Sequence, residues 1–170
     1  MCIIIFKPAG VEMPATGLLK KASVYNPHGC GIVSPSTFYK GLSFAAFMKA
    51  ARRVDRDEPC LIHFRWATHG SVCAENCHPF YDETTGTYFM HNGILSVHPL
   101  GDMTDSEFVF RRDLAPACED GLFTERLGKA VGRAIEGSRF AFMQGDHVRL
   151  FGQWVEDQAG RKYSNGRLFW

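Results

Sequence analysis

The feature that most restricts how this chain can fold is a series of short apolar segments punctuated by dipeptides typical of hairpin turns. Residues 60–66 and 139–144 are such segments, and the dipeptides are Asn92-Gly93, Gly145-Asp146 and Asn165-Gly166. These dipeptides tolerate the backbone angles that tight turns between antiparallel strands require. The pattern therefore predicts antiparallel sheets.

Further strands are expected on either side of these segments. Short β-branched or aromatic runs bounded by Gly, Pro or Asn predict strands at 2–6, 88–91 and 147–155, a turn followed by a strand over 25–33, and a terminal strand after Asn165.

Three helices are expected between the strands. Ser43 begins one, because apolar residues recur after it with the helical period. Thr104 and Glu107 have the spacing of a capping box, which predicts a second helix that ends near Pro116. Thr124 begins a third helix. Helices combined with antiparallel sheets indicate an α+β fold.

Composition places the chain among globular proteins. The 170 residues are 45% hydrophobic and contain no evident repeat or linker, so one domain over residues 1–170 is expected. The formal net charge is +1, which gives no basic surplus for nucleic acid or an anionic membrane. The first apolar run, Cys2–Phe6, is too short to span a bilayer and does not resemble a secretory leader.

The six cysteines do not require a disulfide framework. A chain with this much core-forming material does not need covalent cross-links, so a reduced, cytoplasmic protein is expected. An alternative interpretation is a structural zinc site, with the ligands His69, Cys73, Cys77 and His78. Their spacing lacks a Cys-x-x-Cys knuckle, so no metal and no other cofactor is predicted.

Segment 60–66 contains charged and polar residues where a core strand would be apolar. Strand alternation places Leu61, His63 and Arg65 on one face. A part-buried guanidinium needs a carboxylate partner and suits bidentate binding. Unless a protein side chain supplies that carboxylate, Arg65 is a candidate substrate-binding residue.

Cys2 is a candidate nucleophile, although a cysteine at the head of a strand is more often a small buried hydrophobe. Initiator methionine is commonly removed before small residues, which would give Cys2 both a thiol and a free α-amine. The reference pKa of such an amine is about 7.7–8.0, so it can take the thiol proton near neutrality.

Two further positions fit the same chemistry. Asn92-Gly93 can be a simple turn, or its side-chain amide and glycine N–H can stabilise a developing oxyanion. Asp105 follows the N-cap Thr104, and the capping box leaves its carboxylate free to bind a substrate ammonium.

Several motifs in this order resemble the glutaminase domain of class II (type 2) glutamine amidotransferases, in the N-terminal-nucleophile hydrolase superfamily. They are Cys2-Ile3-Ile4, residues 26–31, residues 63–70, residues 76–80, residues 91–94, residues 104–107 and residues 163–165. The resemblance covers nearly the whole chain, and the ordered set is more specific than any one motif.

The resemblance implies a four-layer αββα sandwich, in which two antiparallel sheets lie between helical layers. It implies that Cys2 is the nucleophile and its α-amine the base, and that Asn92 and Gly93 form the oxyanion hole. It further implies that Arg65 holds the α-carboxylate of L-glutamine and Asp105 its α-ammonium. Thr68, His69, His78, Asn26 and Gly29 match positions near the substrate.

The resemblance also implies that ammonia released from glutamine passes to a separate synthase or ATP-dependent ligase, since no synthase domain is recognised in the sequence. The chain departs from the family pattern between Ser96 and Met103, which is short, and at His28, where an acidic residue is usual. Two alternatives remain open: a hydrolase of other γ-glutamyl amides or peptides, and a non-catalytic relic that senses glutamine or binds a partner.

Overall fold

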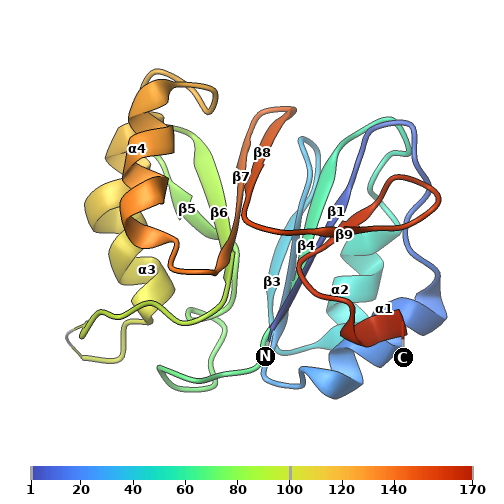
Figure 1. The fold of residues 1–170 in the computed structure, drawn as a ribbon. Helices are drawn as coiled ribbons and strands as arrows, with labels where there is room; N and C mark the ends of the chain where they lie inside the picture. The colour runs from blue at the N-terminus through green and yellow to red at the C-terminus, as the bar shows by residue number, and fades with distance from the viewer. Residues whose placement is uncertain (1, 100, 170) are drawn as a thin grey trace.

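A computed structural model describes residues 2–99 and 101–169, and two antiparallel sheets stand face to face at its centre (Figure 1). The elements are β1 (Ile3–Lys7), α1 (Thr16–Tyr25), β2 (Cys30–Val33), β3 (Phe38–Gly41), α2 (Phe44–Ala51), β4 (Cys60–Phe64), β5 (Phe80–Asp82), β6 (Thr87–Asn92), α3 (Asp105–Val109), the π-helix η1 (Phe110–Leu114), the 3₁₀-helix η2 (Ala115–Cys118), α4 (Glu125–Ala134), β7 (Arg139–Gln144), β8 (His147–Phe151), β9 (Val155–Glu156), β10 (Lys162–Tyr163) and the 3₁₀-helix η3 (Arg167–Phe169).

The larger sheet has the order β3-β2-β4-β1-β10-β9, and the smaller has the order β5-β6-β7-β8. Each strand pair in both sheets is antiparallel, as the turn pattern predicts. In the larger sheet Phe64, at the end of β4, lies opposite Ile3 on one side and Cys30 on the other. This register places Cys2 beside the chain segment that follows β4.

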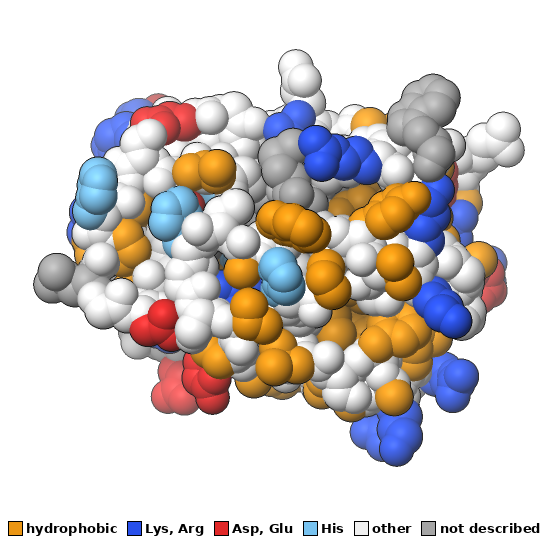
Figure 2. All heavy atoms as spheres, turned by 90° about the horizontal axis from the view of Figure 1, so that it is seen from below, with side chains coloured by type: hydrophobic (Ala, Val, Ile, Leu, Met, Phe, Trp, Pro, Cys, Tyr) orange, Lys and Arg blue, Asp and Glu red, His pale blue; other side chains and the backbone are white. Residues whose placement is uncertain are grey.

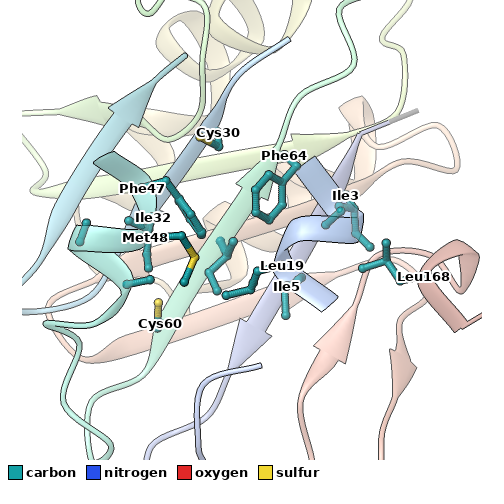
Figure 3. Close-up of a cluster of buried hydrophobic side chains, with 14 of the residues drawn as sticks. Ile3, Ile5, Leu19, Cys30, Ile32, Phe47, Met48, Cys60, Phe64 and Leu168 are labelled. Atoms are coloured by element: carbon teal, nitrogen blue, oxygen red, sulfur yellow. The ribbon is translucent and has the colours of Figure 1, made fainter. Parts of the chain in front are cut away.

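Three apolar clusters hold the layers together. One lies between the larger sheet and helices α1 and α2, and Figure 3 shows Phe47, Leu19 and Phe64 meeting there. A second joins the smaller sheet to α3, η1, η2 and α4, around Phe89 and Phe110. The third lies between the two sheets and includes Ile4, Leu61 and Met90. The helices on the two outer faces make this the expected αββα, α+β architecture (Figure 1).

The predicted faces of strand β4 are confirmed. Cys60, Ile62 and Phe64 belong to the cluster under the helices, whereas Leu61 belongs to the cluster between the sheets. His63 and Arg65 follow Leu61 in the alternation and are 0% and 3% exposed. The interior between the sheets therefore contains an arginine and a histidine at one end.

The predicted helix starts are also confirmed. The side-chain oxygens of Ser43, Thr104 and Thr124 accept hydrogen bonds from the backbone N–H groups of Ala46, Glu107 and Leu127. Each N-cap satisfies a donor that the first helical turn leaves unpaired.

Several secondary-structure predictions were incomplete or wrong, and strands β3 and β5 were not predicted. Helix α1 was not predicted, because the run from Thr16 to Tyr25 has little apolar periodicity and its N-cap makes no side-chain bond. The second helix is irregular. Helix α3 ends at Val109, and the chain continues as η1 and then as η2, which contains Pro116 at an early helical position, where proline needs no donor, and ends at Cys118.

The predicted strand at 147–155 is two strands in different sheets. β8 ends at Phe151, and Gly152 adopts a φ of 90° that turns the chain toward β9 in the larger sheet. The expected terminal strand is the 3₁₀-helix η3. In the part of the chain that the structure describes, no helix is long and apolar enough to cross a membrane.

Candidate active site

One small cavity brings together residues that are far apart in the sequence. Its lining comes from the start of β1, the segment after β4, the end of β6 and the first turn of α3: Cys2, Arg65, Trp66, Ala67, Thr68, His69, Asn76, His78, His91, Gly93, Thr104, Asp105 and Ser106. The cavity measures about 30 Å³. A single water needs roughly 10–15 Å³ on this measure, so the site as it stands has room for a water or two and no amino acid.

The Cys2 thiol is held against the backbone of Trp66. Its Sγ accepts a hydrogen bond from the Trp66 N–H at 3.2 Å and donates to the Trp66 carbonyl oxygen at 3.3 Å. Asn165 donates to the Cys2 carbonyl oxygen at 3.0 Å. Burial raises the pKa of the Cys2 thiol, while the Trp66 hydrogen bond and the charge of Arg65 act in the opposite direction. A thiol in this environment needs a base to become a nucleophile.

Arg65 is buried, and its hydrogen bonds go to backbone oxygens. The guanidinium donates to Ser71 at 2.8 Å, to His69 at 2.9 Å and, at 3.4 Å, to Gly70. Among the described residues no carboxylate lies within 4.0 Å of it. The guanidinium has five N–H donors, so it retains capacity for a carboxylate that enters from solution.

Asp105 lies at the first position of α3 and is 4% exposed. Its Oδ2 accepts from the Leu95 N–H at 2.9 Å, and its Oδ1 accepts from the N–H and hydroxyl of Ser106 at 2.8 and 3.2 Å. No basic side chain lies within 4.0 Å of it among the described residues. A buried carboxylate that faces the cavity without a cation suits an ammonium ligand.

Asn92 and Gly93 end strand β6. The Asn92 side-chain amide donates to the Ser164 hydroxyl at 2.8 Å, and the same hydroxyl accepts from the Ile4 N–H at 2.8 Å. Asn92 therefore connects the smaller sheet to β1, two residues from Cys2. Gly93 has a φ of 154°, and a side chain there would collide with Ser138. Gly93 also lines the cavity, so the chain passes the cavity at a point where only glycine fits.

Three buried histidines lie beside the cavity. The rings of His63 and His78 are 4.3 Å apart, and neither ring has a protein hydrogen-bond partner among the described residues. Burial lowers the pKa of His63 to about 3 and that of His91 to about 4, and it lowers the pKa of His78 well below its ordinary value. All three rings are therefore neutral near neutrality.

A much larger cavity lies away from Cys2. It measures about 620 Å³ and lies between α4 and the helices η1 and η2 on the outer face of the smaller sheet. It shares no lining residue with the small cavity. The cavity with the greater volume is therefore not the cavity at which the ionisable side chains converge, and we take the small cavity as the candidate site.

Most of the predicted site residues meet at this cavity. Cys2, Arg65, Thr68, His69, His78, Gly93 and Asp105 line it, and Asn92 adjoins it. Asn26 and Gly29 do not line it. Asn26 caps the end of α1 by donating to the Ala22 carbonyl oxygen at 3.0 Å, and the Gly29 carbonyl oxygen accepts from the Arg65 N–H at 2.8 Å.

Several residues that shape the site were not predicted from the sequence to take part in it. Ser164 and Asn165 hold Asn92 and Cys2, and Ser106 contacts Asp105. His28 accepts from the Ala67 N–H at 2.9 Å, which ties the segment after β4 to the turn before β2. Ser164 and Asn165 were within a matched motif, but only their spatial neighbours reveal what they hold.

The segment 69–78 does not gather its cysteines and histidines around one point. His69 is exposed, whereas His78 is buried between the sheets, and the Cys77 thiol donates to the Cys73 carbonyl oxygen at 3.3 Å. In residues 2–99 and 101–169, no three His, Cys, Asp or Glu side chains are grouped as metal ligands.

Figure 2 looks onto the end of the molecule where β1 begins. Hydrophobic side chains gather over the part of this face that lies below the larger sheet and its helices. Trp66, Tyr25 and Leu42 are large apolar side chains that are 43%, 51% and 52% exposed. A groove of about 250 Å³, lined by Tyr25, Trp66 and Leu168, adjoins the residues that hold Cys2.

Comparison with known families agrees with the motif analysis. A family model described as class-II glutamine amidotransferases matches residues 45–119. Over 91 residues the chain is 34% identical to the glutamine–fructose-6-phosphate aminotransferase (isomerizing) of Streptococcus pneumoniae, covering 47% of this chain and 15% of that protein. Over 32 residues it is 56% identical to the protein of the same description from Methanocaldococcus jannaschii, covering 19% of this chain and 3% of that protein.

Solved structures show the same fold over almost the whole chain. The glutamine phosphoribosylpyrophosphate amidotransferase of B. subtilis, complexed with ADP and GMP, superposes with a TM-score of 0.65 at 17% identity, covering 99% of this chain and 43% of that one. A structure described as the allosteric regulatory enzyme of purine biosynthesis gives a TM-score of 0.62 at 16% identity, with the same coverage. The chain thus spans less than half the length of the relatives it matches.

Proposed function

We propose that this chain, which has the fold of the N-terminal-nucleophile amidotransferases and matches the class II glutamine amidotransferase model over residues 45–119, hydrolyses the side-chain amide of L-glutamine through a thioester on Cys2. The observation that supports this is the convergence of Cys2, Arg65, Gly93 and Asp105 on one cavity. Residues 1–170 act in this proposal as a single glutaminase domain.

The first step is attack of the Cys2 thiol on the amide carbon of glutamine. Burial raises the pKa of this thiol, so a base must take its proton. Removal of Met1, which lies outside the described residues, exposes the α-amine of Cys2 as that base. The protonated amine then gives its proton to the departing ammonia, and water hydrolyses the γ-glutamyl thioester to glutamate.

The tetrahedral intermediate carries a negative oxygen that needs donors. The Gly93 N–H and the Asn92 side-chain amide supply them in this proposal, and Ser164 fixes the Asn92 amide through a 2.8 Å hydrogen bond. Loss of one oxyanion donor costs about 10²–10³ in kcat in enzymes of this type of chemistry.

The two ends of the amino-acid head group are bound by opposite charges. The spare donors of Arg65 bind the α-carboxylate, and the Asp105 carboxylate binds the α-ammonium. Both protein groups are buried and lack a protein counter-ion among the described residues. A substrate without either charge leaves a buried charge unpaired, which makes the pair a specificity filter. Thr68, His69 and His78 complete the substrate pocket.

The released ammonia passes in this proposal to an acceptor site in a separate synthase or ATP-dependent ligase. The exposed Trp66, whose backbone holds the Cys2 thiol, and the groove beside it give an apolar surface for such a protein to cover. All six cysteines are free thiols. This supports a reducing compartment, and we place the protein in the cytoplasm.

A second candidate function is hydrolysis of another γ-glutamyl amide or peptide without ammonia transfer. Arg65 and Asp105 favour it equally, because they contact only the head group that all γ-glutamyl compounds share. The two functions differ in the leaving group, so they are separated by comparing glutamine with γ-glutamyl peptides as substrates.

The purified protein is expected to release glutamate and ammonia from L-glutamine in equal amounts. Cys2→Ala should abolish this while leaving the unfolding midpoint unchanged, and Cys73→Ala, which removes a partly exposed thiol nearby, should retain activity. Turnover of glutamine by Cys2→Ala would contradict the proposal. Faster turnover of γ-glutamyl peptides than of glutamine would favour the second candidate.

A further inference from the structure

The His91 ring lies between the two halves of the proposed substrate site. It is 2% exposed and belongs to β6, the strand that leads into Asn92 and Gly93. On one side its Nδ1 is 2.7 Å from the Ser106 hydroxyl, in the first turn of α3. The ring is therefore the point at which the end of β6 meets the start of α3.

One assignment of the protons satisfies both hydrogen bonds of the Ser106 hydroxyl. In this assignment the hydroxyl donates its single hydrogen to Oδ1 of Asp105 at 3.2 Å, because a carboxylate only accepts. The hydroxyl oxygen then accepts from His91, whose ring carries its proton on Nδ1. This leaves His91 Nε2 as a buried acceptor, and it has no hydrogen-bond partner among the described residues.

The Nε2 side of the ring lies against Gly93. A Cβ added at Gly93 would lie 2.9 Å from His91 Nε2, so only a glycine permits this contact. The ring of Phe140 meets the His91 ring edge to face, with centroids 5.3 Å apart, and limits its movement. Contacts thus run without a break from Asp105 through Ser106 and His91 to Gly93.

We propose that His91 is a positioning residue that couples the ammonium-binding carboxylate to the oxyanion hole. This inference rests on the proposed function, since it assigns Asp105 to the substrate ammonium and Gly93 to the oxyanion. When the ammonium binds Asp105, Ser106 and His91 hold the Gly93 N–H where the negative oxygen develops. The acceleration of the chemical step therefore depends on recognition of the amino acid at the other end of the molecule.

Two contacts in series have a measurable consequence. Loss of the Ser106–His91 contact or of the His91–Gly93 contact interrupts the same line of contacts. Loss of both contacts should therefore lower kcat no more than loss of one. Two residues with unrelated packing roles would instead show losses that multiply. The losses should fall on kcat and leave KM nearly unchanged, because the head group still meets Asp105 and Arg65.

The test is a double-mutant cycle of Ser106→Ala and His91→Asn. Ser106→Ala removes the first contact, whereas His91→Asn retains a donor near Nδ1 and removes the ring edge that reaches Gly93. We expect each variant to lower kcat about tenfold, part of the 10²–10³ that a lost oxyanion donor costs, and the double variant to match the single ones. Ser106→Thr, which keeps the hydroxyl, should recover most of the rate.

Ser34→Ala is the matched control. Ser34 is also buried and also donates to a carboxylate, Glu58, but it lies at the far end of β2. It should match the wild type in kcat and KM. Multiplicative losses, or single-variant effects that fall on KM, would overturn the inference. If the double variant does not fold, the inference is tested by two other results: whether the single variants change kcat and not KM, and whether Ser106→Thr recovers the rate. A wild-type protein without glutaminase activity would overturn the proposed function instead.

Discussion

The two charged ends of the candidate site are built in different ways. Asp105 is the first residue of a capped helix, and three donors from Leu95 and Ser106 fix both of its oxygens. Arg65 follows the end of a strand, and its guanidinium is held by carbonyl oxygens of residues 69–71, which are exposed. The ammonium end is set by regular structure, and the carboxylate end by a surface loop.

This difference indicates which part moves to admit substrate. A cavity of about 30 Å³ cannot hold glutamine, so the site must open. The loop of residues 66–76 belongs to neither sheet, whereas α3 is packed in the apolar cluster of the smaller sheet. We therefore expect the carboxylate end to open and close over a fixed ammonium end. Four predictions test this comparison.

The largest effect is expected at the fixed end. Asp105→Ala removes the ammonium partner and leaves the buried N–H groups of Leu95 and Ser106 unpaired. It should lower kcat/KM by about 10³ or more. It should also lower the free energy of unfolding by about 1–3 kcal/mol. Asp113→Ala, which removes an exposed carboxylate paired with Arg112, is the control and should change neither quantity much. Steady-state kinetics and urea unfolding measure both.

Acid should destabilise the interior next to the fixed end. His63, His78 and His91 have pKa values lowered by burial, so the folded state holds them neutral while the unfolded state protonates them below about 6.5. Stability is therefore full above pH 6.5 and is lost as the pH falls toward 4. Each histidine contributes about 1.4 kcal/mol per pH unit in that range.

Urea unfolding between pH 7 and pH 4.5 measures this loss. His78→Gln should flatten the pH dependence, because one of the three titrating groups is gone. His98→Gln, which replaces an exposed histidine, should leave the slope as in the wild type. A stability that does not change over this range would show that the three rings are not buried as neutral groups.

A smaller effect, confined to substrate binding, is expected at the mobile end. Arg65→Lys loses the fork that binds a carboxylate and the loop carbonyls together, so KM for glutamine should rise about 10–100-fold with little change in kcat. Arg149→Lys is a matched control, since Arg149 also donates to two backbone carbonyls, those of Leu122 and Thr124, but far from Cys2. An unchanged KM in Arg65→Lys would place the carboxylate elsewhere.

The smallest effect is expected from loosening the loop itself. Asp102 accepts from the Ser71 N–H at 2.8 Å and from the Ser71 hydroxyl, and these bonds lower the pKa of its carboxyl. Asp102→Ala should raise KM by a few-fold, because the closed loop becomes less favourable, and should leave the unfolding midpoint unchanged. A loss of kcat/KM as large as that of Asp105→Ala would show that the carboxylate end is fixed as firmly as the ammonium end. The proposed difference between the two ends would then be wrong.

The sequence predicted the fixed parts of the molecule well because local rules determine them. The caps at Ser43, Thr104 and Thr124 depend on a hydroxyl and the N–H groups of the next turn. The faces of β4 follow from strand alternation alone. Helix α1 was missed because its stability comes from packing Leu19 and Ala22 into the cluster under the larger sheet, which the sequence does not display.

The candidate site was predicted in part for the same reason. Cys2, Arg65, Gly93 and Asp105 could be named because each has a residue type suited to one task. Ser164 and His91 could not, since their roles depend on partners that the packing of the two sheets and of α3 brings close from 72 and 15 residues away. Asn26, a matched motif residue, ends helix α1 through its side chain and lines the groove beside Trp66, and its contribution to substrate binding stays a prediction.

The central claim is that Cys2 carries the γ-glutamyl group during hydrolysis, and intact-protein mass spectrometry after rapid acid quench with saturating glutamine tests it most directly. The account predicts a protein that lacks Met1 and a fraction heavier by one γ-glutamyl group, with the added mass on the peptide that begins at Cys2. An active protein that retains Met1 would contradict the claim. So would an active protein that never acquires the added mass, provided that the Asn92→Ala variant and samples quenched slowly also remain unmodified.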